Sequence, residues 1–200
     1  MKLHQWVPAA HTGDAIGDSA RKMRGMVRAL GHDSEIFALT IDDDLRGDVR
    51  PFVDPEARAG DVTLFHYALP SPMTEAFARL PHGRVLQYHN VTPARFFAPY
   101  DPALFRLASL ARAELASLVG RVDLALAVSE FNRSELVELG FDPTGVLPLA
   151  VDVSRVSRPV SRPALEKILS SDDMINFLFV GRIAPNKRIE DHLRLAEHYK

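Results

Sequence analysis

Hydrophobic residues follow two alternating patterns along the 200-residue chain. One pattern is a short, nearly continuous apolar run, which is typical of a strand buried on both faces of a sheet. The other places apolar residues three or four positions apart, which predicts a helix with one buried face. Because the two patterns alternate, the chain is expected to form a doubly wound parallel sheet with helices on both faces, an α/β fold.

The expected strands share a high content of Val, Leu, Ile and Phe. They are Lys2–Val7, Ser34–Leu39, Val49–Val53, Asp61–Tyr67, Arg84–Tyr88, Asp123–Val128, Val146–Ala150 and Ile175–Val180. Pro51 has no backbone N–H to donate, so it would confine its strand to an edge of the sheet. Helical spacing runs from Ile16 to Leu30, from Leu104 to Leu118 and from Arg188 to Tyr199.

The periodic pattern stops near residue 150, and this predicts the domain organisation. Residues 1–150 are expected to form one complete sheet domain. Residues 151–174 read as a linker, because they begin with a stretch that has no periodicity and contains Pro159 and Pro163. Residues 175–200 supply only one strand and one helix, which cannot build a core of their own. We therefore expect them to be the start of a second, incomplete domain.

Composition and charge narrow the function classes. The chain has no cysteine, which excludes a disulfide scaffold, a catalytic thiol and zinc sites with Cys ligands. Its 24 basic and 26 acidic residues give a net charge of −2, which does not favour a nucleic-acid partner. No apolar run approaches the ~20 residues of a transmembrane segment, and no hydrophobic signal region opens the chain. A cytoplasmic location is the resulting expectation.

Polar residues follow several expected strands at their carboxyl ends, where doubly wound sheets bind ligands. Gly13, Asp14 and Gly17 lie in a loop that feeds a helix, where backbone N–H groups can approach an anion such as a phosphate. A tight turn with an Asp cap explains the same loop equally well. His66 and His89 each end a strand, and Asn90 follows. Imidazole and amide groups suit contacts to an acceptor or to sugar hydroxyls, although a histidine at a strand end is often incidental.

The strongest chemical signal lies near the C-terminal end of the sequence. A buried run exits into Gly181, then Arg182, and Lys187 follows at the start of the last expected helix. A planar guanidinium and an ammonium beside a helix N-terminus are suited to a phosphate or diphosphate. The alternative is a pair of solvated cations on a loop.

Two further patterns carry less weight. Asp42-Asp43-Asp44 contains an Asp-x-Asp, which holds a divalent metal in some sugar transferases, but a solvated charge run explains it better. Ser129 is best explained as a helix cap. A nicotinamide dehydrogenase is excluded because the G-x-G-x-x-G fingerprint is missing.

Taken in order, these segments resemble the family 4 glycosyltransferases over the whole chain. Phe179–Lys187 resembles the family's Gly-Arg-x-x-x-x-Lys element, which is fairly specific. Tyr88–Thr92 resembles the strand end with the family's active-site His. Weaker likenesses lie at Gly13–Gly17, Ala29–Ile36 and Ala127–Phe131.

The resemblance implies a retaining enzyme of GT-B fold, built from two Rossmann-like domains, that uses a nucleotide-diphosphate sugar donor. Residues 1–150 would be the acceptor-side domain. Arg182 and Lys187 would hold the donor diphosphate, and His89 would be the catalytic-site residue that approaches the transferred sugar. The Gly13–Gly17 loop would close over donor phosphate and acceptor. The resemblance requires no metal and no other cofactor, and it leaves the acceptor unknown.

The chain also departs from this family. Members are about twice as long, and the Glu-(x)7-Glu element that binds sugar and ribose is absent. We therefore expect a truncated glycosyltransferase that is inactive as this chain alone. Apolar residues of the incomplete domain, such as Phe177 and Leu193, would then favour self-association. The alternative from another class is a non-catalytic domain that binds an acceptor or a partner. Arg outnumbers Lys, which suggests a GC-rich bacterial genome.

Overall fold

The computed structural model describes residues 1–153, 162–170 and 175–199. The chain divides into two compact units, Met1–Val151 and Asp152–Lys200. The sequence-predicted linker, residues 151–174, falls partly on residues 154–161 and 171–174, which lie outside the described residues.

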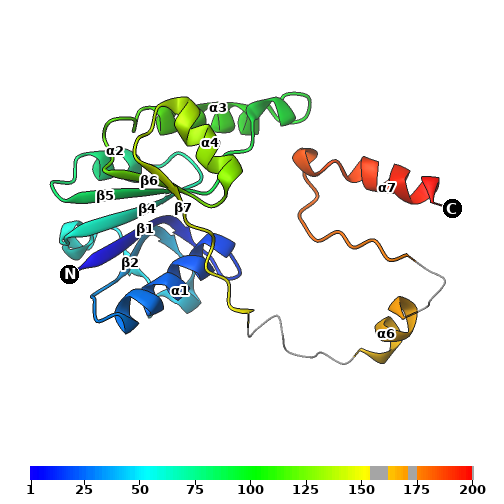
Figure 1. The fold of residues 1–200 in the computed structure, drawn as a ribbon, viewed down its shortest axis with the longest axis horizontal. Coiled ribbons are helices and arrows are strands. Elements are labelled where there is room, and N and C mark those ends of the chain that lie inside the picture. Colours follow the sequence, from blue (N-terminus) through cyan, green and yellow to red (C-terminus); the bar gives the residue numbers. More distant parts are fainter. Residues whose placement is uncertain (154–161, 171–174, 200) are drawn as a thin grey trace. The chain divides into compact units, whose positions relative to one another are not determined.

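The first unit is built on one sheet of seven parallel strands in the order β3-β2-β1-β4-β5-β6-β7 (Figure 1). This confirms the predicted doubly wound parallel sheet. The strands are β1 (Leu3–Ala10), β2 (Ile36–Ile41), β3 (Arg50–Pro51), β4 (Val62–Tyr67), β5 (Gly83–Tyr88), β6 (Leu124–Ala127) and β7 (Thr144–Val146).

The helices of the first unit cover the sheet unequally. Helix α1 (Ala15–Ala29) packs on one face, and α2 (Met73–Ala78), α3 (Pro102–Ala116) and α4 (Glu130–Leu139) pack on the other (Figure 1). Two separate apolar cores result. The larger core includes Trp6, Phe65 and Leu115, and the smaller one includes Val7 and Ala20. Burial of these side chains is the main term that stabilises the unit.

The strand order determines where the chemistry can lie. The chain moves from β1 to β2 and β3 in one direction, then from β4 to β7 in the other, so the order switches between β1 and β4. Ligands of such folds bind beyond the carboxyl ends of the strands near this switch. Strands β1, β4 and β5 end at Ala10, Tyr67 and Tyr88, all at one edge of the sheet.

Strand boundaries differ from the prediction in two places. The last strand of the sheet is β7, Thr144–Val146, so the expected Val146–Ala150 lies mostly beyond it. The Leu147 N–H still donates to the Ala127 carbonyl of β6 at 2.8 Å, but its own carbonyl accepts from the side chain of Gln87 at 2.9 Å. Pro51 lies in β3 at the edge of the sheet, as its missing N–H predicted.

The second unit contains α6 (Pro163–Leu169) and α7 (Ile189–His198). The strand predicted at Ile175–Val180 is wrong, because these residues are described and are not in a strand. Buried backbone N–H and C=O groups need partners, and no segment of the described second unit pairs with this one. Its apolar side chains, Leu178 and Val180 among them, are exposed.

Within the described residues, no helix has the length and apolar content that crossing a bilayer requires.

Candidate functional site

The loop after β1 begins the candidate site. Gly13 has a φ of +80°, which glycine adopts without strain. Asp14 then caps α1, because its carboxylate accepts a hydrogen bond from the Gly17 backbone N–H at 2.9 Å. The Asp cap considered for this loop is therefore present. The Gly17 N–H is already satisfied, so a phosphate that binds this N–H would have to displace the Asp14 carboxylate.

Two carboxylates after β2 hold the same loop. Asp42 Oδ1 lies 2.8 Å from His11 Nδ1, and Asp42 Oδ2 accepts from the Thr12 backbone N–H at 3.0 Å. Asp44 accepts from the Thr12 hydroxyl at 2.6 Å. The hydrogen bonds from His11 and Thr12 lower the pKa of Asp42. Asp42 is partly exposed and Asp44 is exposed, as a solvated run predicts, but their side chains also join the ends of two neighbouring strands.

His66 and His89 form a direct pair at the carboxyl ends of β4 and β5. His66 Nδ1 and His89 Nε2 are 2.9 Å apart, and the two rings stack with their centroids 5.1 Å apart. His66 is fully buried, and His89 is half-buried. The sequence indicated each histidine separately, and the parallel pairing of β4 with β5 brings them together.

The pair continues inward to a third side chain. His66 Nε2 lies 3.0 Å from Gln5 Oε1, and Gln5 Nε2 donates to the Ala20 carbonyl of α1 at 3.0 Å. Gln5 is fully buried on the central strand β1. Only the polar character of its strand could have pointed to this residue from the sequence.

Burial keeps both imidazoles uncharged at neutral pH. It lowers the pKa of His89 to about 4, and it lowers the pKa of His66 together with the electrostatic effect of His89. A buried imidazolium loses the hydration that stabilises its charge, so the neutral ring is favoured. The pair is therefore suited to hydrogen bonding with neutral polar groups rather than to binding an anion.

The backbone beyond His89 is held by a network that the sequence did not indicate. Asn90 is exposed and has a φ of +77°. The next N–H, from Val91, donates to the Tyr88 hydroxyl at 3.0 Å, and that hydroxyl donates to Glu135 Oε2 at 3.1 Å. Arg112 donates to Glu135 Oε1 at 2.6 Å and to the Val91 carbonyl at 3.1 Å. Arg112 and Glu135 come from α3 and α4, so no local spacing reveals their meeting.

Arg182 and Lys187 lie in the second unit. Both side chains are exposed, and neither has an ion-pair partner within the described part of the chain. Lys187 ends a short 3-10 turn, Pro185–Lys187, and α7 begins two residues later at Ile189. The expectation that Lys187 opens the helix is thus off by one short turn, because Pro185 starts that turn and Arg188 follows it in a left-handed conformation.

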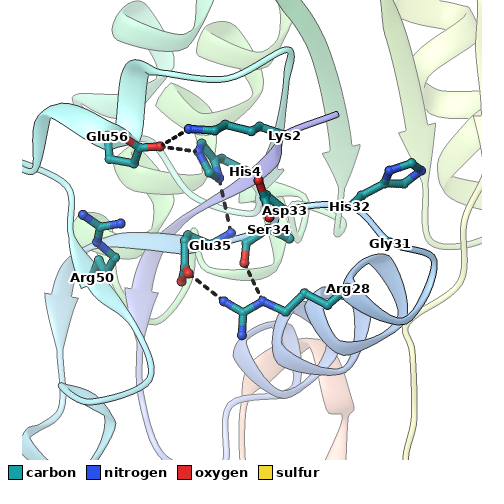
Figure 2. A pocket seen from close by; sticks show the side chains of 10 residues that line it. All are labelled: Lys2, His4, Arg28, Gly31, His32, Asp33, Ser34, Glu35, Arg50 and Glu56. Carbon is teal, nitrogen blue, oxygen red and sulfur yellow. Dashed lines mark hydrogen bonds and ion pairs between the residues drawn. The ribbon is translucent and has the colours of Figure 1, made fainter.

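A cavity of about 600 Å³ lies at the opposite, amino edge of the sheet (Figure 2). Its cations are paired: Lys2 Nζ is 2.9 Å from Glu56 Oε1, and Arg28 Nη2 is 2.6 Å from Glu35 Oε1. The Glu35 N–H donates to Nδ1 of buried His4 at 3.2 Å. These contacts hold the starts of the strands together. Lys2 and Arg28 are both paired with carboxylates, so neither is free for an anionic ligand. The candidate site is therefore assigned to the carboxyl edge.

No group of three or more His, Cys, Asp or Glu side chains in the described ranges is arranged to hold a metal ion.

The fold is the Rossmann-like type found in glycosyltransferases. The chain is similar to the solved structure of an α-glucosyltransferase in complex with UDP and a 13-mer DNA containing a HMU base. The TM-score is 0.53 at 11% identity over 78% of this chain and 44% of that one. A second α-glucosyltransferase structure, with UDP and a 13-mer DNA containing a central A:G mismatch, gives 0.49 at 8% identity over 78% and 43%. No protein-family model and no curated protein sequence matches the chain.

The expectation of no nucleic-acid partner is overturned by the first of these neighbours, because that structure holds DNA. The exclusion rested on a net charge of −2. Net charge sums over the whole chain, whereas phosphate contacts depend on a few local side chains and backbone N–H groups. The chain also spans less than half the length of the α-glucosyltransferase chains it matches.

Proposed function

We propose that the protein is a glycosyltransferase that transfers a sugar from a nucleotide-diphosphate donor to an acceptor hydroxyl with retention of configuration. The observation that carries the proposal is the His66–His89 pair at the carboxyl edge of this sheet, 2.9 Å between nitrogens and adjoining the order switch. Neutral imidazoles at that position suit the hydroxyl groups of a sugar.

Residues 1–150 form the acceptor side in this proposal, and residues 175–200 belong to the donor side. His89 addresses the transferred sugar, with His66, Asn90 and the Gly13–Gly17 loop near it. Arg182 and Lys187 hold the diphosphate and stabilise the charge that develops as the sugar leaves. Their exposure and lack of carboxylate partners within the described residues support this role. The base and ribose contacts remain unassigned in this chain.

The acceptor is proposed as a molecule with a free hydroxyl group. Free sugars and glycans carry many such groups. The DNA in the complexes of the α-glucosyltransferases makes modified DNA a second acceptor to test. Binding titrations of the 200-residue chain should therefore compare a sugar mixture with duplex DNA that contains a hydroxymethyl base.

Titration with uridine diphosphate tests the donor site in the chain itself. A charge-assisted hydrogen bond contributes ~1.5–3 kcal/mol, and exposure to water and salt favours the lower end. Two or three such contacts, less the cost of association, give a dissociation constant on the order of 1 mM. We expect binding that weakens with salt and that scarcely distinguishes uridine from guanosine diphosphate, measured by NMR.

Single-residue variants test which side chains bind uridine diphosphate. Arg182→Ala should abolish it, and His89→Ala should leave it almost unchanged, because His89 addresses the sugar. Arg194→Ala is the matched control, since Arg194 is an exposed arginine of α7 that pairs with Asp191 at 3.3 Å. Equal losses in Arg182→Ala and Arg194→Ala would show only a general charge effect and would refute the diphosphate role.

A further inference from the structure

The hydrogen bonds from α1 to His89 have a fixed direction. The Ala20 carbonyl only accepts, so the side-chain nitrogen of Gln5 must face it, at 3.0 Å. The amide oxygen of Gln5 then faces His66 Nε2, 3.0 Å away. That oxygen also only accepts. His66 therefore carries a proton on Nε2.

The same reasoning extends to the second histidine. A neutral His66 with its proton on Nε2 has a lone pair on Nδ1. His89 Nε2, 2.9 Å from that lone pair, must then carry the proton of the shared hydrogen bond. Burial of both rings favours their neutral forms. Only Nδ1 of His89 is left with a lone pair.

We propose that Gln5 and His66 are positioning residues that fix His89 as the tautomer with its proton on Nε2 and its lone pair on Nδ1. Each group in the series from Ala20 to His89 accepts from the next, so no member can reverse without leaving two donors or two acceptors face to face. A buried donor or acceptor without a partner is costly. The order of donors and acceptors that the Ala20 carbonyl of α1 sets therefore extends through Gln5 and His66 to His89.

The tautomer limits what His89 can bind. Its Nδ1 is covered by protein and has no hydrogen-bond partner among the described residues. A group that reaches this nitrogen must donate a proton to it. A hydroxyl does so, whereas a phosphate oxygen does not. This role rests on the proposed function, and it gives His89 a hydroxyl rather than the donor diphosphate as its ligand.

The series also explains a polar residue in an otherwise apolar position. Gln5 is fully buried at the centre of the sheet, where its neighbours in β4 and β2 are Leu64 and Ile36. An apolar side chain would fill this position without the need for two hydrogen bonds. The glutamine supplies one acceptor and one donor in fixed positions, which an apolar residue cannot supply.

NMR of the 200-residue chain, with its histidine side chains labelled with nitrogen-15, tests the proposal without any ligand. Long-range proton–nitrogen spectra distinguish protonated from unprotonated ring nitrogens, and the variants His66→Phe and His89→Gln identify the two rings. At pH 7 we expect His66 and His89 each to be a single tautomer protonated on Nε2. A proton on Nδ1 of His89 would overturn the proposal.

Removing the acceptor at residue 5 tests the cause. The methionine of Gln5→Met has a similar length and stays buried, but it cannot accept a hydrogen bond from His66. The nitrogen-15 chemical shifts of His89 Nδ1 and Nε2 should then move toward each other, because two tautomers mix. Gln87→Met is the matched control, because Gln87 is a fully buried glutamine on the strand beside His66 and is bonded to Leu147 instead. That variant should leave His89 unchanged.

A second variant keeps the test valid if Gln5→Met does not fold, as judged by Trp6 fluorescence. His66→Phe removes the nitrogen that accepts from His89 directly, so His89 should again become a mixture of two tautomers. A fixed His89 tautomer in either folded variant would overturn the positioning role. Loss of diphosphate binding with the tautomer intact would instead refute the proposed function alone.

Discussion

At the scale of single residues, the candidate site contains two histidines that burial keeps uncharged at neutral pH. His66 is fully buried, and His89 is half-buried beside it. The rings are stacked, so a charge on one would lie next to the other. A proton on Nδ1 of His66 would also place two donors face to face between the rings. The folded state therefore resists protonation that the unfolded chain accepts.

This resistance predicts a loss of stability in weak acid. In the unfolded chain a histidine has its ordinary pKa of 6.5, but in the folded state burial lowers the pKa of His89 to about 4. Between these values the unfolded state binds more protons, so the free energy of unfolding falls as the pH falls from about 6.5 to 4. At ~1.4 kcal/mol per pKa unit, His89 contributes up to ~3 kcal/mol to this fall.

Urea unfolding at pH 7 and at about pH 4.5 measures the effect. The His89→Gln variant has one fewer titrating ring and should lose less stability between the two conditions. The difference reports the His89 ring together with its electrostatic effect on His66, because the two rings interact directly. Identical losses in the two proteins would contradict the assignment.

At the scale of elements, the loop between β1 and α1 is held from both sides. Asp14 caps the helix from within the loop, and Asp42 and Asp44 bind the loop from the end of β2. The backbone adds the Asp42 N–H, which donates to the Ala10 carbonyl at 3.0 Å. The loop that would approach a donor is thus oriented before any ligand binds.

Replacement of Asp42 should release this loop without unfolding the unit. In Asp42→Ala the Thr12 N–H loses its partner, so its hydrogen exchange should become about ten-fold or more faster, at ~1.4 kcal/mol per factor of ten. Asp43→Ala is the control, because exposed Asp43 pairs only with Arg46 of its own turn among the described contacts, at 3.0 Å. Equal exchange rates of Thr12 in the two variants would show that the loop does not depend on Asp42.

The Asp14 cap leads to a separate expectation. Asp14→Ala should lower the free energy of unfolding by ~1 kcal/mol, because the Gly17 N–H loses its acceptor, whereas Asp14→Asn should retain most of the stability. Denaturant titration of the two variants measures this difference. A stable Asp14→Ala would mean that the cap is not needed and that the carboxylate serves the site alone.

At the scale of the whole molecule, the first unit contains its own core. Every buried residue of the two apolar clusters lies between Trp6 and Phe141. The apolar side chains of residues 175–183 in the second unit are instead exposed, for example Leu178 at 89% and Ile183 at 90%. The stability of the sheet should therefore not depend on residues 152–200.

Removal of residues 152–200 tests this independence. We expect one cooperative unfolding transition with a free energy within about 0.5 kcal/mol of the value for the same unit in the full chain, because the core is unchanged. Trp6 is fully buried in that core, so its fluorescence reports the transition. A clearly lower stability of the shortened chain would show that the second unit contributes to the fold of the first.

The sequence by itself determined the fold class and the edge to which the site residues belong. Continuous apolar runs and helical spacing depend only on local burial patterns, and the missing N–H of Pro51 predicted the edge strand. Local pattern also misled at Ile175–Val180, because a run with strand composition becomes a strand only when another segment pairs with it.

Only the tertiary structure decided the chemistry of the site. Gln5, His66 and His89 lie far apart in the sequence and meet because β1, β4 and β5 are neighbours in the sheet. Arg112 and Glu135 meet because α3 and α4 pack on the same face. The charge state, the tautomer and the direction of each hydrogen bond depend on these long-range contacts and on burial, which a linear pattern of residues does not contain.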